Sequence, residues 1–160
     1  MKAASTILGI SPGTRTMGLA ILKDGELIDW RVKTFRGAWF ESKLKDILYV
    51  LKSYIEENGV TTVVLKKPDV FRTSNGLEQL ISDLKALCQR NKIRATMLSI
   101  KTMKEQYSRE KGFTKTKMIK QIAIRYPELY ADYNKEMRNK NRYYVKMFEA
   151  IALASHTFLP

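Results

Sequence analysis

Four positions of this 160-residue sequence carry polar side chains where predicted secondary-structure elements end or meet: Ser11, Lys66, Lys146 and Glu149. One carboxylate beside a hydroxyl and two ammonium groups suits the binding of an anion. A site for two divalent cations needs several carboxylates instead. These residue types therefore favour contact with a negatively charged partner.

Each of the four residues also has an ordinary structural role open to it. Ser11 precedes a Pro-Gly pair, as serine does in many tight turns. Lys66 belongs to a lysine pair that fits a solvated surface. Glu149 follows Lys146 by three residues, a spacing at which the two side chains can pair on a helix. A joint function requires that the four side chains converge in space.

Hydrophobic patterning predicts the elements that position these residues. Strands over 6–11, 18–23 and 27–34 form an antiparallel meander, because Asp24-Gly25 supplies a turn between the second and the third. Beyond them, apolar residues spaced by three and four predict helices, and a short β-branched run predicts a buried parallel strand. In order, we expect a helix over 41–58, a strand over 61–65, a helix over 77–88 with Ser74 or Asn75 as its N-cap, a strand over 93–98, and helices over 100–107, 115–126 and 144–158.

This order predicts an α/β fold with a five-stranded mixed sheet, whose first three strands are antiparallel and whose later strands are parallel, with helices on both faces. Right-handed crossovers place the first and fourth strands side by side, so their ends meet the last helix. The polar segment 128–141 is predicted to be a mobile loop. We see no repeat or linker, and expect one domain over residues 1–160.

The charge of the chain is strongly positive and uneven. Lys and Arg number 29 against 16 Asp and Glu, and residues 101–146 hold thirteen basic and five acidic side chains. Such a field attracts polyanions, nucleic acid above all, although a merely solvated surface is the alternative. The candidate contacts to nucleic acid are Arg15, Lys101, Lys104, Lys115, Lys117, Lys135, Arg138, Lys140 and Arg142. Tyr133, Tyr143 and Tyr144 interleave with these charges, where they either stack on unpaired bases or belong to the core.

Several classes of protein are excluded by composition. A single Cys and a single His exclude an internal disulfide and a Cys/His zinc site, and Cys88 is expected to be a buried thiol. No apolar run reaches the roughly 18 residues of a membrane span, and the first residues lack the apolar core of a signal peptide. We therefore expect a cytoplasmic protein without a membrane partner.

Three motifs resemble, in the same order and over nearly the whole chain, the RuvC family of Holliday junction resolvases. They are Gly9-Ile10-Ser11-Pro12-Gly13-Thr14 with Gly18, the strand end Val63-Val64-Leu65-Lys66, and Phe148-Glu149-Ala150-Ile151-Ala152-Leu153-Ala154. The resemblance implies a ribonuclease H-like fold, a homodimer, and cleavage of four-way DNA junctions by carboxylates that hold two divalent metal ions.

The same resemblance implies four carboxylates, of which this chain keeps one. The family has Asp where Ser11 stands, Glu where Lys66 stands, and two Asp residues at the positions of Lys146 and Glu149. These exchanges make the site more positive by about five charges, against two metal ions that need anionic oxygens. We therefore expect a catalytically degenerate protein that binds branched or duplex DNA by shape and backbone, with no resident metal and no cofactor.

Other functions stay open on the sequence alone. One is an active nuclease with a reduced site on Glu149, helped by Asp69 and loaded with Mg²⁺ or Mn²⁺; whether the chain is an enzyme is thus undecided. The first motif also resembles that of the YqgF group, which acts on ribosomal RNA precursors, so RNA is a possible ligand. It resembles the first phosphate loop of actin-like and sugar-kinase ATPases as well, but those folds are far longer. A protein-interaction module is the remaining alternative.

Overall fold

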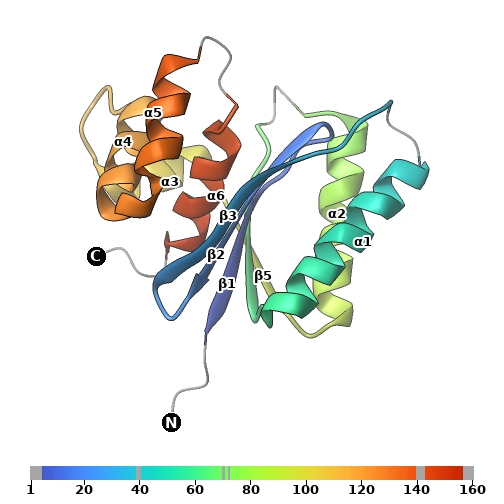
Figure 1. Ribbon diagram of the computed structural model, residues 1–160. Helices are drawn as coiled ribbons and strands as arrows, with labels where there is room; N and C mark the ends of the chain where they lie inside the picture. Colours follow the sequence, from blue (N-terminus) through green and yellow to red (C-terminus); the bar gives the residue numbers. More distant parts are fainter. Residues whose placement is uncertain (1–4, 39–40, 70, 72, 140–142, 157–160) are drawn as a thin grey trace.

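The computed structural model describes residues 5–38, 41–69, 71, 73–139 and 143–156, and it has one mixed sheet with helices on both sides (Figure 1). The strands are β1 (Thr6–Ser11), β2 (Thr16–Lys23), β3 (Glu26–Thr34), β4 (Thr62–Lys66) and β5 (Arg94–Leu98). The helices are α1 (Glu41–Asn58), α2 (Asn75–Arg90), α3 (Ile100–Tyr107), α4 (Lys115–Arg125), a 3₁₀ turn (Pro127–Leu129), α5 (Tyr130–Arg138) and α6 (Val145–Ala154).

The strand order is β3-β2-β1-β4-β5, which confirms the predicted α/β fold. β1 and β3 are antiparallel to β2, whereas β4 is parallel to both β1 and β5. Ile10 of β1 lies opposite Leu65 of β4, so the carboxyl ends of these two strands share one edge of the sheet. Residues that follow them, one from each strand, are therefore neighbours.

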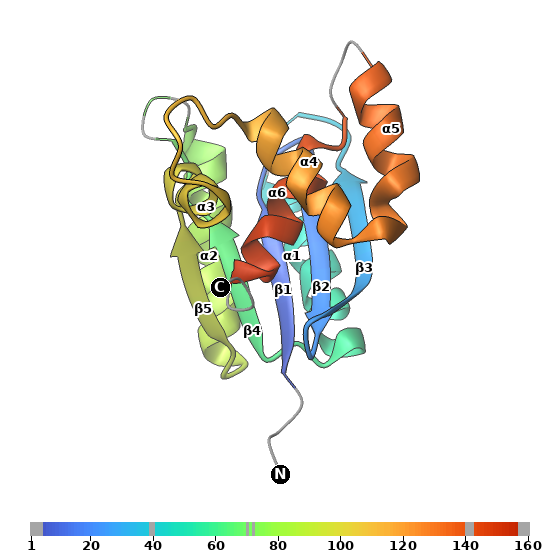
Figure 2. The ribbon, with the colours of Figure 1, turned by 90° about the vertical axis from the view of Figure 1, so that its left-hand side faces the viewer.

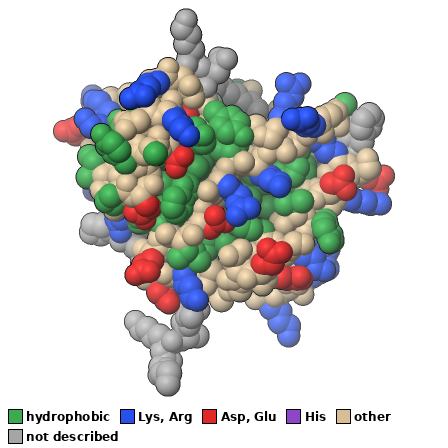
Figure 3. Space-filling view, in the orientation of Figure 1, with side chains coloured by type: hydrophobic (Ala, Val, Ile, Leu, Met, Phe, Trp, Pro, Cys, Tyr) green, Lys and Arg blue, Asp and Glu red, His purple; other side chains and the backbone are tan. Residues whose placement is uncertain are grey.

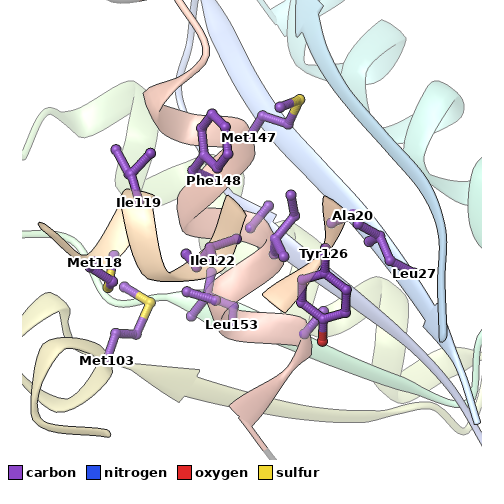
Figure 4. Packing of buried hydrophobic residues seen from close by; sticks show 14 of the residues in the cluster. Ala20, Leu27, Met103, Met118, Ile119, Ile122, Tyr126, Met147, Phe148 and Leu153 are labelled. Carbon is purple, nitrogen blue, oxygen red and sulfur yellow. The ribbon is translucent and has the colours of Figure 1, made fainter. Parts of the chain in front are cut away.

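The helices form two layers of different character. α1 and α2 cover one face of the sheet, while α6 lies against the other face with α3, α4 and α5 outside it (Figures 1 and 2). Phe148 and Leu153 of α6 pack with Ile119 and Ile122 of α4 in one hydrophobic cluster (Figure 4). α6 is thus enclosed between the sheet and the outer helices.

Two glycines allow α6 to lie directly on the strands. A Cβ atom at Gly18 of β2 would lie 1.9 Å from the carbonyl oxygen of Lys146, and one at Gly9 of β1 would lie 2.0 Å from that of Ala150. Both contacts are with helix backbone, which no rotamer change can move. The glycines of the first motif thus fix where the polar residues of α6 stand relative to β1.

The prediction of a mobile loop over 128–141 is wrong, because most of this segment is the 3₁₀ turn and α5. Leu129 is fully buried, and Tyr133 and Met137 pack against the same cluster at a spacing of four residues. This helical period is present in the sequence but is masked by the surrounding polar residues. Asp132 also accepts a hydrogen bond from the indole N–H of Trp30 at 3.0 Å, which ties α5 to β3.

Elsewhere the predicted elements differ from the observed ones mainly at their ends. The last helix ends at Ala154 rather than at 158, with Ser155 as its C-cap. Ser74 is the N-cap of α2, and its side chain accepts a hydrogen bond from the amide of Leu77. In the described part of the chain, no helix has the length and apolar character needed to cross a membrane.

Candidate functional site

A buried carboxylate stands at the edge of the sheet where β1 and β4 end. Glu149 of α6 is 1% exposed, and its Oε1 lies 3.4 Å from the hydroxyl of Ser11, which donates to it. Its Oε2 lies 2.7 Å from Nζ of Lys66 and 3.5 Å from Nζ of Lys115. Three of the four residues singled out in the sequence therefore meet, joined by a lysine from α4.

The local structure explains how these groups converge. Ser11 and Lys66 are the last residues of two neighbouring strands, and Glu149 lies in the second turn of the helix that crosses them. Lys115 opens α4, whose N-cap Thr114 accepts a hydrogen bond from the amide of Lys117. No two of these four elements are adjacent along the chain, so the cluster exists only in the folded state.

The start of α6 is fixed by a second buried carboxylate. Glu136 of α5 is fully buried, and its Oε2 accepts a hydrogen bond from the backbone amide of Tyr144 at 2.7 Å. A negative charge at this position interacts favourably with the positive N-terminal end of the α6 dipole and so stabilises the start of the helix. α5 thereby sets the position of the helix that carries Lys146 and Glu149.

Lys146 does not pair with Glu149. Its ammonium donates to the carbonyl oxygen of Thr16 at 3.1 Å, so the pairing with Glu149 that the sequence spacing allowed is not formed. Burial lowers the pKa of Lys146, and the nearby charges of Lys66 and Lys115 lower it further, against the opposing effect of Glu149. The ammonium of Lys146 is thus held in a positive environment.

A cleft of about 690 Å³ opens beside this cluster. Five lysines line it, which we call the lysine cleft: Lys66, Lys67, Lys101, Lys115 and Lys146. Pro12, Pro68, Leu77 and Ile100 supply apolar walls.

Asp69 also lines the cleft, but its Oδ1 accepts a hydrogen bond from the amide of Phe71 at 3.0 Å. Among the described residues, no three His, Cys, Asp or Glu side chains are grouped as ligands of one metal ion. The charged side chains that line the cleft are thus five lysines and one aspartate.

The nine basic residues predicted to contact nucleic acid fall into separate groups. Lys101 and Lys115 line the cleft, and Lys104 and Lys117 follow them on α3 and α4. Arg15 is exposed in the turn between β1 and β2. Lys135 and Arg138 are exposed on α5, which stands on the β3 side of α6 (Figure 2). The cleft is instead lined by residues at the end of β4 and at the start of α3. Lys140 and Arg142 lie outside the described residues.

Charged side chains of both signs are spread over the face shown in Figure 3. Lys and Arg lie along its upper edge and also in its centre and at its lower rim, where Asp and Glu lie among them. Of the three tyrosines, Tyr133 packs against the core, and Tyr144 is partly buried there with the ring of Tyr143 edge-on to it at 5.1 Å. Only Tyr143, which is 46% exposed, presents a large surface to solvent.

Two side chains near this edge of the sheet carry no clear signal in the sequence. Lys67 fits a solvated lysine pair by its sequence context, yet it lines the cleft together with Lys66. Phe71, in the loop that follows β4, is 95% exposed, the highest fraction among the large hydrophobic side chains that the structure describes. In the sequence Phe71 is marked only by a Val-Phe pair inside a run of polar and basic residues.

The sequence matches no protein-family model, and it shows no significant similarity to any curated protein. Solved structures do share its fold. RuvC of Thermus thermophilus in complex with a Holliday junction substrate superimposes with a TM-score of 0.68 and 13% identity, over 96% of this chain and 93% of that one. A second Thermus thermophilus RuvC structure gives a TM-score of 0.71 and 11% identity, with the same coverage.

A viral structure is similar over the same length. The complex of Fowlpox virus resolvase with substrate Holliday junction DNA has a TM-score of 0.61 and 16% identity, and covers 95% of both chains. At these identities the likeness establishes a shared RuvC-like, ribonuclease H-like fold along nearly the whole described chain. This confirms the fold that the sequence motifs implied.

Proposed function

We propose that this protein binds branched or duplex DNA through the lysine cleft and the basic surface beside it, and that it does not cleave the DNA. The observation that carries the proposal is the 2.7 Å ion pair between Lys66 and Glu149. It places an ammonium group on the carboxylate that a metal ion would need. Contact with phosphates is then electrostatic, without an activated water.

The residues present do not fit a two-metal site. Two divalent ions about 4 Å apart carry four positive charges and need several anionic oxygens. Glu149 is the one carboxylate in the cluster and faces two ammonium groups within 3.5 Å, while Ser11 offers only a neutral hydroxyl. The charge of the cluster thus repels cations and attracts phosphates.

The structural neighbours supply the kind of partner. The Thermus RuvC and the Fowlpox virus resolvase were solved with Holliday junction DNA, and their fold extends over nearly all of this chain. A four-way DNA junction is therefore the first ligand to test, with duplex DNA and a four-way RNA junction as comparisons. A homodimer, which the resemblance implies, would place two lysine clefts on one junction.

Binding is measured best by fluorescence anisotropy at several salt concentrations. We expect affinity for the junction to fall steeply with added salt, since each phosphate contact releases a counterion. The double variant Lys67→Ala with Lys101→Ala is expected to weaken binding, whereas Lys23→Ala, at the far end of β2, serves as the matched control. Affinity that does not change with salt contradicts the proposal.

Cleavage is tested on the same junction with Mg²⁺ or Mn²⁺. We expect no product from the purified protein at either metal. Product that disappears in Glu149→Gln would instead establish the nuclease alternative. Failure to bind DNA or RNA at physiological salt would favour a protein-interaction module.

A further inference from the structure

The volume of the lysine cleft limits what can enter it. Its volume of about 690 Å³ is that of a small-molecule site, which typically measures about 300–1,000 Å³. The major groove of DNA alone is about 12 Å wide, so a duplex can only pass over the mouth of such a pocket. A cavity of this volume has room for a single nucleotide unit.

The walls of the pocket suit the two halves of a nucleotide. Ammonium groups of the lysine cleft provide contacts for a phosphate, while Leu77, Ile100 and two prolines provide an apolar surface for a base or sugar. Lys67 and Lys101 form no ion pair within the described part of the chain, in contrast to Lys66 and Lys115. These two lysines therefore have their charge available to a ligand.

The charge of the pocket exceeds what one internal phosphate requires. Five lysines against the carboxylates of Asp69 and Glu149 leave three positive charges when all are ionised. An internal phosphodiester carries one negative charge, whereas a terminal phosphate carries about −1.5 to −2 at pH 7. α3 begins at the wall of the pocket, with Ser99 as its N-cap, and its N-terminus adds partial positive charge.

We propose that the lysine cleft binds the phosphorylated end of a nucleic-acid strand, with the terminal phosphate on the lysines and the terminal nucleotide against the apolar wall. This inference rests on the proposed function, because it assigns part of the same nucleic-acid surface. It adds that one strand end is recognised in preference to the interior of a strand.

The test compares three single strands of identical sequence: one with a 5′-phosphate, one with a 3′-phosphate and one with hydroxyl groups at both ends. Each carries an internal fluorophore, and binding to the full-length protein is followed by anisotropy. We expect one phosphorylated end to bind about tenfold more tightly than the hydroxyl-ended strand, as one added charge-assisted contact would give. A nucleoside monophosphate is expected to compete with that end.

Two variants locate the effect. Lys101→Ala, which changes an exposed side chain, should abolish the preference for the phosphorylated end, while Lys23→Ala should leave it intact. Leu77→Trp fills the pocket and should remove the same preference without abolishing junction binding; its thermal unfolding curve reports whether the fold is kept.

Equal affinities for the three strands overturn the inference, and so does a preference that survives both Lys101→Ala and Leu77→Trp. If the junction still binds in either case, the proposed function stands and only the end-binding pocket fails. If neither the junction nor any single strand binds, the two proposals fail together.

Discussion

The two faces of the sheet are built from alternate residues of the same strands, yet they differ in kind. Toward α1 and α2 the strands present large aliphatic side chains, such as Leu8 and Ile10 of β1 and Leu65 of β4. Toward α6 the intervening residues of β1 include Gly9 and Ser11. One face is a conventional apolar layer, whereas the other admits a helix backbone and ends in a charged cluster.

The contrast shows how a polar site can be placed on a stable core. Large side chains on the α1–α2 face need no polar partners and can hold the sheet by burial alone. Small residues on the α6 face let the helix approach closely enough for Glu149 to reach two strand ends. The close approach of α6 therefore positions the charged cluster. A substitution can alter the packing of one face without altering that of the other.

The largest effect is expected from filling the contact between α6 and β2. Gly18→Ala places a methyl group 1.9 Å from a backbone oxygen, and should lower the free energy of unfolding by about 3 kcal/mol. Leu65→Ala on the opposite face should cost a similar amount through the cavity that it leaves. Urea unfolding measures both.

The affinity for DNA of Gly18→Ala and Leu65→Ala, measured where both variants are folded, shows which face of the sheet supports binding. We expect Gly18→Ala to weaken binding, because it displaces the helix that carries Lys146 and Glu149, and Leu65→Ala to leave binding unchanged. Equal binding by the two variants would show that the lysine cleft does not depend on the close approach of α6.

A smaller loss is expected when the buried carboxylate is neutralised. Glu149→Gln leaves two ammonium groups without their anion and should cost about 2 kcal/mol, less than a fully buried pair because Lys66 and Lys115 are partly exposed. Affinity for DNA at low salt should rise, since the cleft gains net positive charge.

A double-mutant cycle that combines Glu149→Gln with Lys66→Met measures how much the ion pair itself contributes to stability. We expect the double variant to lose less stability than the sum of the single variants, since neither partner is then left alone. Strict additivity of the two losses would argue that the 2.7 Å ion pair contributes nothing to stability.

The hydrogen bond between Trp30 of β3 and Asp132 of α5 is expected to stabilise α5, the helix that the sequence did not predict. Asp132→Ala removes the acceptor of the Trp30 indole N–H and should lower the free energy of unfolding by about 1 kcal/mol. Hydrogen exchange in α5 should speed up more than in α1. If Asp132→Ala changes exchange in α5 no more than in α1, this bond does not hold α5 on the sheet.

The smallest effect is a dependence on alkaline pH. The pKa of Lys146 is lowered below its ordinary 10.5 by burial first and by Lys66 next, so the folded state disfavours its charged form. Between the lowered pKa and 10.5 the unfolded chain binds more protons, and stability therefore rises with pH in this window. Lys146→Met should flatten this rise in urea titrations.

DNA binding should change in the opposite direction over the same pH range. As Lys146 loses its proton below its ordinary pKa of 10.5, affinity should decline, and Lys146→Arg should delay the decline because arginine stays protonated. Identical pH profiles for wild type and Lys146→Arg would exclude a role of this charge in binding.

Local patterning was enough for most of the fold. The meander and the helix that begins after Ser74 follow from period and turn residues, which act within short stretches. The pairing of β1 with β4 follows from the handedness of the crossover between parallel strands. α5 was missed because its apolar spacing lies within a polar, basic segment, and the buried side of such a helix is defined only by what covers it.

The sequence by itself determined which side chains the site contains. They are one Glu, and a Ser and two lysines at positions where the resemblance implies carboxylates. Only the tertiary structure decided how those charges pair. Lys66 and Lys115, rather than the sequence neighbour Lys146, neutralise Glu149, and Lys146 bonds to Thr16 instead. The physical reason is that an ion pair depends on distances of a few Å between separate elements, which the close packing of α6 against two glycines sets and which sequence spacing does not encode.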